Sequence, residues 1–165
     1  MRAYKVLALD TGTKTGFAIG YPDDKIESGV QDFSLKRGES AGMRFIIFRA
    51  WLEKIITATA PDLIVYEQAH HRGGAATDLC VGMTTRIVEI AALHDINCTS
   101  CHSAKLKKFA TGSGRASKED MIVAAEKLTG IKPQDDNEAD ALCLLAFARE
   151  EYEPKVEKSV RKDKT

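Results

Sequence analysis

Two short apolar runs constrain the fold of this chain more than any other feature. Residues 4–10 read YKVLALD and residues 62–67 read DLIVYE, so each run is almost continuously apolar and ends in an acidic residue. Unbroken runs of this kind are typical of strands buried on both faces, whereas a strand with one solvent-exposed face alternates apolar and polar residues. We therefore expect both runs to lie inside a sheet that is covered on each side.

The remaining pattern predicts one mixed α/β domain over residues 1–152. Short β-rich runs at 15–20 and 27–33 follow turn signals, which favours an antiparallel three-stranded opening. One more strand is expected at 96–101. Helices are expected, from apolar residues at three- and four-residue steps, at 40–59, 75–94, 103–111, 117–128 and 136–150. This order predicts a mixed five-stranded sheet flanked by helices.

The first two helices each carry an apolar stripe that predicts the buried face. The stripe of helix 40–59 consists of Met43, Ile46, Ile47, Ala50, Trp51, Ile55 and Ala58. The stripe of helix 75–94 consists of Leu79, Met83, Ile87, Ile90 and Ala91. Both stripes are expected to pack into the core. Beyond the last helix, residues 153–165 are basic and almost free of apolar side chains, so they are expected to form a disordered tail.

Composition excludes some classes and leaves others open. The chain has 24 basic and 24 acidic residues, so a case for nucleic-acid binding depends on local clusters of charge. No run reaches the length of a membrane span, and the first residues form a strand pattern, which favours a cytoplasmic protein. The cysteines are then expected as free thiols. Two less favoured alternatives use the Cys98–His102 segment, as covalently attached haem or as zinc bound by Cys98, Cys101 and His102.

Three carboxylates are candidate metal ligands. Asp10 and Glu67 close the two central strands, and neighbouring strands would place them at one end of the sheet. The first turns of the last helix contain Asp136 and Asp140, and Asp140 lies among small or apolar residues, where a lone carboxylate is costly. Close carboxylates repel unless a cation lies between them, and oxygen-only ligands suit magnesium or manganese. The alternative reading of each acid is a turn cap, an ion pair with lysine, or a favourable charge at a helix N-terminus.

Four segments, in order, resemble the RuvC family of crossover-junction endodeoxyribonucleases. They are LALDTGTKTGFAIG at residues 7–20, VYEQ at 65–68, the basic and glycine-containing segment at 107–118, and NEADALCLLAFA at 137–148. The resemblance covers most of residues 4–150. It implies a ribonuclease H-like fold and a magnesium-dependent endonuclease, acting as a homodimer on Holliday junctions in DNA recombination and repair. Part of helix 75–94 would then form the dimer face.

The resemblance also implies roles for individual residues. Asp10, Glu67 and Asp140 would be catalytic metal ligands for two Mg²⁺ ions, which Mn²⁺ could replace. The family usually has another acid three residues before the last, where this chain has Asn137, so either Asn137 or Asp136 would supply the fourth ligand. Lys118 would act near the scissile phosphate. The DNA contacts would come from Lys107, Lys108, Arg115 and Lys118, together with His70, His71 and Arg72 in the loop after Glu67.

The sequence leaves two alternatives to a strict junction resolvase open, and chain length argues against a third. The first is a nuclease of the same kind that also debranches forks and flaps. The second is a non-catalytic junction-binding protein, in which Asn137 marks a lost site. The third is a sugar kinase or ATPase of the related actin-like fold, which also opens with an acid and a glycine-rich hairpin but needs a longer chain.

Overall fold

A mixed five-stranded sheet forms the centre of the computed structural model, which describes residues 4–69 and 73–152. The strands are β1 (Val6–Asp10), β2 (Lys14–Gly20), β3 (Ile26–Asp32), β4 (Leu63–Glu67) and β5 (Asn97–Cys101). The helices are α1 (Ala41–Thr59), α2 (Ala75–Leu93), α3 (Ser103–Thr111), α4 (Lys118–Thr129) and α5 (Asp136–Tyr152). Each element expected from the sequence is present, with bounds that differ by two residues at most.

The two apolar runs form the middle of the sheet, as expected. The strand order is β3-β2-β1-β4-β5, in which β1 pairs antiparallel with β2 and parallel with β4. β2 also pairs antiparallel with β3, and β4 pairs parallel with β5. Residues Val6 to Leu9 of β1 are fully buried. Their continuous apolar character therefore reflects a strand covered on both faces.

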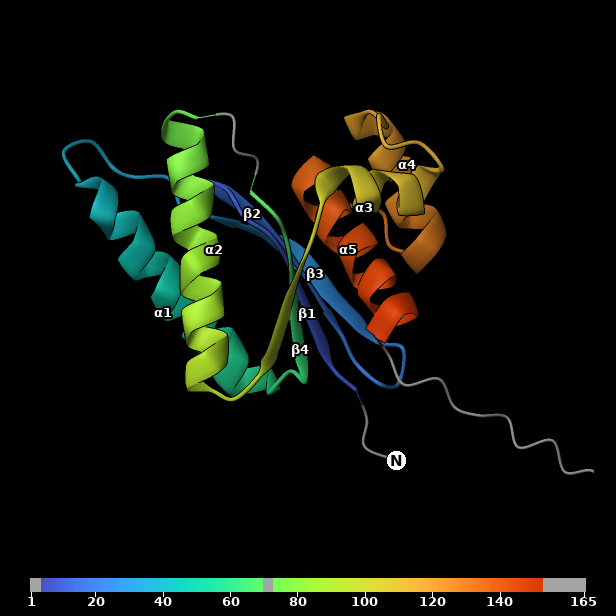
Figure 1. Cartoon of the computed structure of the whole chain (residues 1–165), viewed down its shortest axis with the longest axis horizontal. Helices are drawn as coiled ribbons and strands as arrows, with labels where there is room; N and C mark the ends of the chain where they lie inside the picture. The colour runs from blue at the N-terminus through green and yellow to red at the C-terminus, as the bar shows by residue number, and fades with distance from the viewer. Residues whose placement is uncertain (1–3, 70–72, 153–165) are drawn as a thin grey trace, which may run out of the picture.

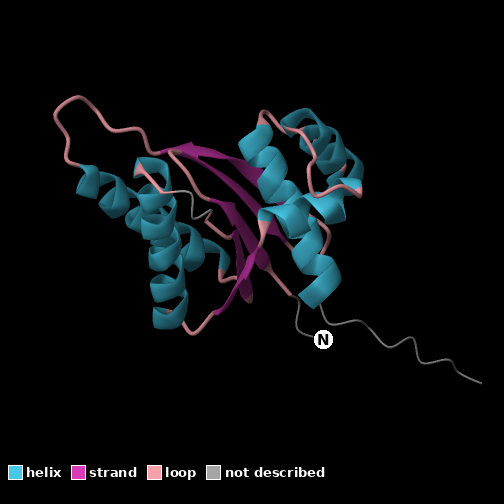
Figure 2. Cartoon of the chain, turned by 45° about the horizontal axis from the view of Figure 1, so that its top comes forward, coloured by secondary structure: helices cyan, strands magenta, loops and turns pink. Residues whose placement is uncertain are grey.

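Helices cover the sheet in two layers (Figures 1 and 2): α1 and α2 lie on one face, and α3, α4 and α5 lie on the other. Alternate residues of β1 point into different cores. Leu7 and Leu9 pack in the core with α1 and α2, whereas Val6 and Ala8 pack in the core with α5. The central strand β1 therefore contributes side chains to two separate cores, one formed with α1 and α2 and the other with α5.

The expected buried face of α1 is only partly right, because Trp51 and Ile55 pack against the core but the other five residues of the stripe do not. The core residues of α1 are Phe48, Leu52 and Ile56, whereas Ile46 is 62% exposed. Met43 and Ile47 are exposed as well, and so are Ala50 and Ala58. Apolar residues occur on more than one side of this helix, so periodicity alone did not select the face. The choice follows from aromatic contacts, because Phe33 meets both Phe48 and Trp51 edge to face, at ring-centroid distances of 5.3 and 5.4 Å.

The stripe of α2 is confirmed, since Met83, Ile87, Ile90 and Ala91 are buried between α1 and the sheet. Within residues 4–69 and 73–152, no helix is both long enough and apolar enough to cross a membrane. The tail expected at 153–165 lies outside the described residues, and the limits of the domain stay a prediction.

Candidate active site

Three carboxylates meet at one edge of the sheet. Asp10 and Glu67 each end a strand, one residue beyond Leu9 and Tyr66, which form the last pair between β1 and β4. α5 lies on the face of the sheet that α3 and α4 also cover (Figure 1), and it brings Asp140 close to Asp10 and Glu67. One carboxylate oxygen from each residue lies within 4.8 Å of the other two, and all three residues are half-buried. The expectation that these three acids lie together is confirmed, and their roles as metal ligands stay a prediction.

Gly16 allows α5 to come this close to the sheet. It lies opposite Asp10 in the β1–β2 pair. A Cβ at this position would lie 1.9 Å from the carbonyl oxygen of Asn137 and 2.5 Å from its carbonyl carbon. No side chain can occupy that space unless the backbone moves. The missing side chain of Gly16 therefore sets the distance between Asp140 and the strand ends.

Hydrogen bonds hold the N-terminus of α5 in place. Asp135 caps the helix, because its Oδ1 accepts a hydrogen bond from the backbone N–H of Glu138 at 2.9 Å. The buried Glu138 carboxylate accepts from Ser28 Oγ at 2.7 Å and from the backbone N–H of Gln134 at 2.8 Å. Glu138 thus connects α5 to β3 and supports the site without belonging to it.

Asp10 and Asp140 favour the protonated state when no cation is present. Burial raises the pKa of Asp10 well above its usual value, and the charges of Glu67 and Asp140 raise it further. Burial, followed by Glu67 and Asp136, raises the pKa of Asp140 to about 7, although Lys107 and Lys118 lower it. A cation among these oxygens would offset both the burial and the repulsion.

Asn137 and Asp136, the two candidates for a fourth ligand, differ in their contacts. Among the described residues, the group of oxygens within 4.8 Å contains Asp10, Glu67 and Asp140 but not Asp136. The Oδ2 of Asp136 instead lies 2.9 Å from Nζ of Lys118. The side-chain N–H of Asn137 donates to Oδ2 of Asp135 at 3.4 Å, which leaves the amide oxygen of Asn137 for another partner.

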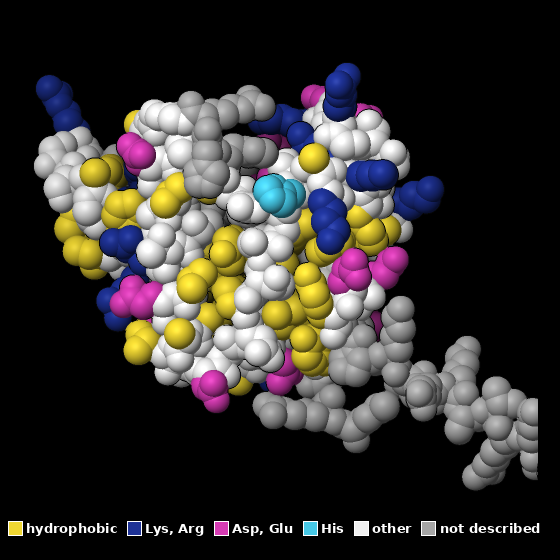
Figure 3. Space-filling view, viewed as in Figure 1, with side chains coloured by type: hydrophobic (Ala, Val, Ile, Leu, Met, Phe, Trp, Pro, Cys, Tyr) yellow, Lys and Arg dark blue, Asp and Glu magenta, His cyan; other side chains and the backbone are white. Residues whose placement is uncertain are grey.

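Basic residues from α3 and α4 border this edge of the sheet. Lys107 is half-buried on α3, whereas Lys108, Arg115 and Lys118 are exposed. Lysine and arginine side chains gather on the α3–α4 side of the face shown in Figure 3. The local cluster expected from the sequence is therefore present, despite a net charge of zero. Three further predicted DNA contacts, His70, His71 and Arg72, lie outside the described residues.

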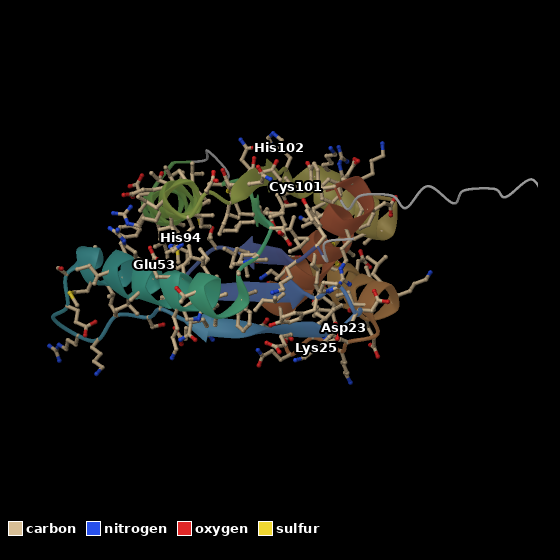
Figure 4. The ribbon with its side chains drawn as sticks, turned by 90° about the horizontal axis from the view of Figure 1, so that it is seen from below. Asp23, Lys25, Glu53, His94, Cys101 and His102 are labelled. Atoms are coloured by element: carbon tan, nitrogen blue, oxygen red, sulfur yellow. The ribbon has the colours of Figure 1, made fainter. Side chains whose placement is uncertain are left out.

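The zinc alternative at Cys98–His102 does not fit the strand. Side chains alternate along β5, so Cys98 packs in the core with α1 and α2, whereas Cys101 packs in the core with α5. His102 follows Cys101 at the end of the strand and is exposed (Figure 4). All four cysteines are free thiols, as expected. Cys98 and Cys101 face opposite sides of the sheet and cannot bind one ion together.

Sequence reasoning missed Glu138 and Ser28 as residues that support the site. The Asp135–Glu138 spacing, D-x-x-E at a helix start, is a capping signal that could have identified the helix end. The Ser28–Glu138 contact joins residues 110 positions apart, so no local pattern reveals it.

The central mixed sheet and the acidic cluster at its edge define a protein of the ribonuclease H-like fold. The model of one family, crossover junction endodeoxyribonuclease RuvC, matches residues 6–148. The chain belongs to the RuvC family.

Individual relatives agree with this assignment. The RuvC of Carboxydothermus hydrogenoformans is 32% identical over 102 residues, which span 60% of this chain and 64% of that relative. The RuvC of Chlamydia muridarum is 26% identical over 151 residues, or 84% of this chain and 87% of the relative. The structure of Thermus thermophilus RuvC in complex with a Holliday junction substrate shares the fold, with a TM-score of 0.73 and 18% identity over 89% of this chain and 96% of that chain.

Proposed function

We propose that this chain is a Holliday-junction resolvase, a metal-dependent endonuclease that hydrolyses phosphodiester bonds at four-way DNA junctions. The observation that carries the proposal is the set of three carboxylate oxygens within 4.8 Å, in a member of a family of crossover junction endodeoxyribonucleases. The Thermus thermophilus relative of the same fold has been solved with a Holliday junction. We further propose that the enzyme acts as a homodimer and works in the cytoplasm.

The residues present fit divalent cations. The three ligands offer only oxygen, and a bound cation would offset the burial and the repulsion that together raise the pKa of Asp10 and Asp140. Oxygen-only sites suit Mg²⁺, and Mn²⁺ is a natural substitute. Asp10, Glu67 and Asp140 would hold the metal, with Asn137 or Asp136 as the fourth contact. Two bound Mg²⁺ ions would activate a water molecule and stabilise the leaving oxygen.

The basic residues would bind and orient the DNA. Lys118 lies at the first position of α4, where its ammonium group would offset negative charge on the reacting phosphate. Lys107, Lys108 and Arg115 would contact the DNA backbone, and the N–H groups at the start of α4 add a positive dipole end. His70, His71 and Arg72 would contact bases or phosphates near the branch. The protein then supplies both the alignment of the DNA and the charge around it.

Replacing one carboxylate tests the proposal directly. Asp10→Asn and Asp140→Asn are each expected to abolish cleavage of a four-way junction in Mg²⁺, because each removes a charged ligand. Both are expected to keep wild-type affinity for the junction, because neither removes a basic residue. Gel assays of cleavage and of binding check the two expectations, and full cleavage by either variant would contradict the proposal.

The same assay separates the resolvase from its alternatives. Matched four-way, three-way and linear duplexes are compared at equal concentration, and we expect the four-way junction to be cleaved fastest. Equal rates on three-way DNA would favour a broader debranching nuclease. Binding of junctions with no cleavage, and no heat of metal binding in calorimetry, would favour the non-catalytic alternative suggested by Asn137.

A further inference from the structure

The first residues of α4 and α5 form an ion pair beside the acidic cluster. Nζ of Lys118 lies 2.9 Å from Oδ2 of Asp136. We propose that Asp136 is a positioning residue, which holds the Lys118 ammonium group beside the reacting phosphate and does not bind metal. This inference rests on the proposed nuclease function and assigns Asp136 a role distinct from the ligands.

The backbones at both ends of this pair are fixed. In α4, Oγ of Ser117 accepts from the N–H of Asp120 at 3.1 Å, and the N–H of Ser117 donates to Oδ2 of Asp120 at 2.9 Å. In α5, Asp135 caps the first turn. The two helices pack together in one core, where the thiol of Cys143 on α5 donates to the carbonyl of Met121 on α4. Capping and packing therefore hold the backbones of Lys118 and Asp136 at the starts of two helices that are packed together.

The side chain of Lys118, in contrast, has little to hold it except Asp136. It is 77% exposed, and a lysine side chain has many rotamers when it lacks a partner. Asp136 lies one helical turn before Asp140 on α5, so an ammonium group paired with Asp136 lies on the side of the helix that carries Asp140. The ammonium group thus lies within the electrostatic range of the carboxylates. The ion pair with Asp136 therefore favours the rotamer of Lys118 that keeps its ammonium group near the carboxylates.

The contacts of the neighbouring acids leave Asp136 free for this role. The three clustered oxygens belong to Asp10, Glu67 and Asp140, and the amide of Asn137 is oriented by its donation to Asp135. The amide oxygen of Asn137 is then available at the position of the missing fourth acid. An exposed ion pair contributes little to folding, so the effect of Asp136 is expected on the reaction and not on stability.

A double-mutant cycle tests the proposal with the full chain. Asp136→Asn is expected to lower kcat on a four-way junction by up to about fivefold, the range of an exposed ion pair, with KM, melting temperature and calorimetric Mg²⁺ binding unchanged. Asp136→Glu is expected to restore kcat. Glu119→Gln is the matched control, because it removes an acid next to Lys118 that forms no ion pair with it, and it is expected to match wild type.

The Lys118→Met background decides between positioning and ligation. If Asp136 acts through Lys118, adding Asp136→Asn to Lys118→Met changes neither kcat nor Mg²⁺ affinity. A further loss of Mg²⁺ affinity in that background would show a metal ligand and overturn the proposal, as would an unchanged kcat for Asp136→Asn alone. A wild-type chain that cleaves no branched DNA would instead overturn the proposed function, and the role of Asp136 would fall with it.

Discussion

At the scale of single residues, Asp140 links the stability of the metal-free protein to pH. Its pKa is about 7 in the folded chain, against a usual value of 3.8. Between these two values the folded state keeps a proton that the unfolded state has released, so raising the pH through this window destabilises the fold. With a chelator present, we expect a lower melting temperature at pH 8 than at pH 5.

Two comparisons isolate this effect. Asp140→Asn has no carboxylate to titrate, so the difference in melting temperature between pH 5 and pH 8 is expected to shrink. Saturating Mg²⁺ is expected to raise the melting temperature more at pH 8, because protons no longer compete for Asp140. An identical pH dependence for wild type and Asp140→Asn would show that other groups control the effect.

The sequence predicted the residues of the site that follow from strand geometry. Asp10 and Glu67 close two apolar runs, and parallel neighbours place such ends together. The contacts of Asp136 and Asn137 could not be predicted, because adjacent residues of a helix point about 100° apart and only packing decides what each one meets. The pairing of Asp136 with Lys118 depends on how α4 packs against α5, which no local pattern encodes.

At the scale of secondary-structure elements, the contact between β2 and α5 leaves no room for a side chain at Gly16. Gly16→Ala would place a Cβ 1.9 Å from the carbonyl oxygen of Asn137, so α5 must move away from the sheet. We expect destabilisation of about 1–3 kcal/mol, typical of overpacking, together with weaker Mg²⁺ binding as Asp140 moves. Urea denaturation and calorimetry measure the two effects.

Gly12→Ala is the matched control in the same hairpin. A Cβ on Gly12 would meet its nearest atom outside the adjacent residues, the carbonyl oxygen of Lys14, at an ordinary distance of 3.6 Å. It is therefore expected to leave both stability and Mg²⁺ binding close to wild type. Equal behaviour of the two alanine variants would mean that the spacing of α5 does not depend on Gly16.

Elements were predicted more reliably than their orientation. The bounds of α1 follow from its periodicity and from Pro61, yet its apolar residues occur on more than one side. Phe33, in the segment after β3, contacts Phe48 and Trp51 and so determines which side is buried. The core face of α2 was predicted correctly, because four residues of its stripe recur at three- and four-residue steps and are all buried, namely Met83, Ile87, Ile90 and Ala91.

At the scale of the whole molecule, the two helical layers have different tasks. α1 and α2 cover one face of the sheet, whereas α3, α4 and α5 supply Lys107, Lys118 and Asp140 on the other. The acidic cluster lies where the central strands end. The chain can therefore concentrate positive charge beside the site, on α3 and α4, while its net charge remains zero.

This division predicts that the salt dependence of junction binding comes from the α3–α4 side. Each lysine that neutralises a phosphate releases bound counterions, which adds about 0.9 to the slope of log affinity against log salt concentration. Lys107→Ala is expected to reduce the slope by about 1, whereas Lys54→Ala, an exposed change on α1, is expected to leave it unchanged. Measuring junction affinity for Asp10→Asn and these variants in that background, from low to physiological salt, keeps the DNA intact. An equal loss of slope for both lysines would mean that DNA contacts the two layers alike, because counterion release depends only on which side chains meet phosphate.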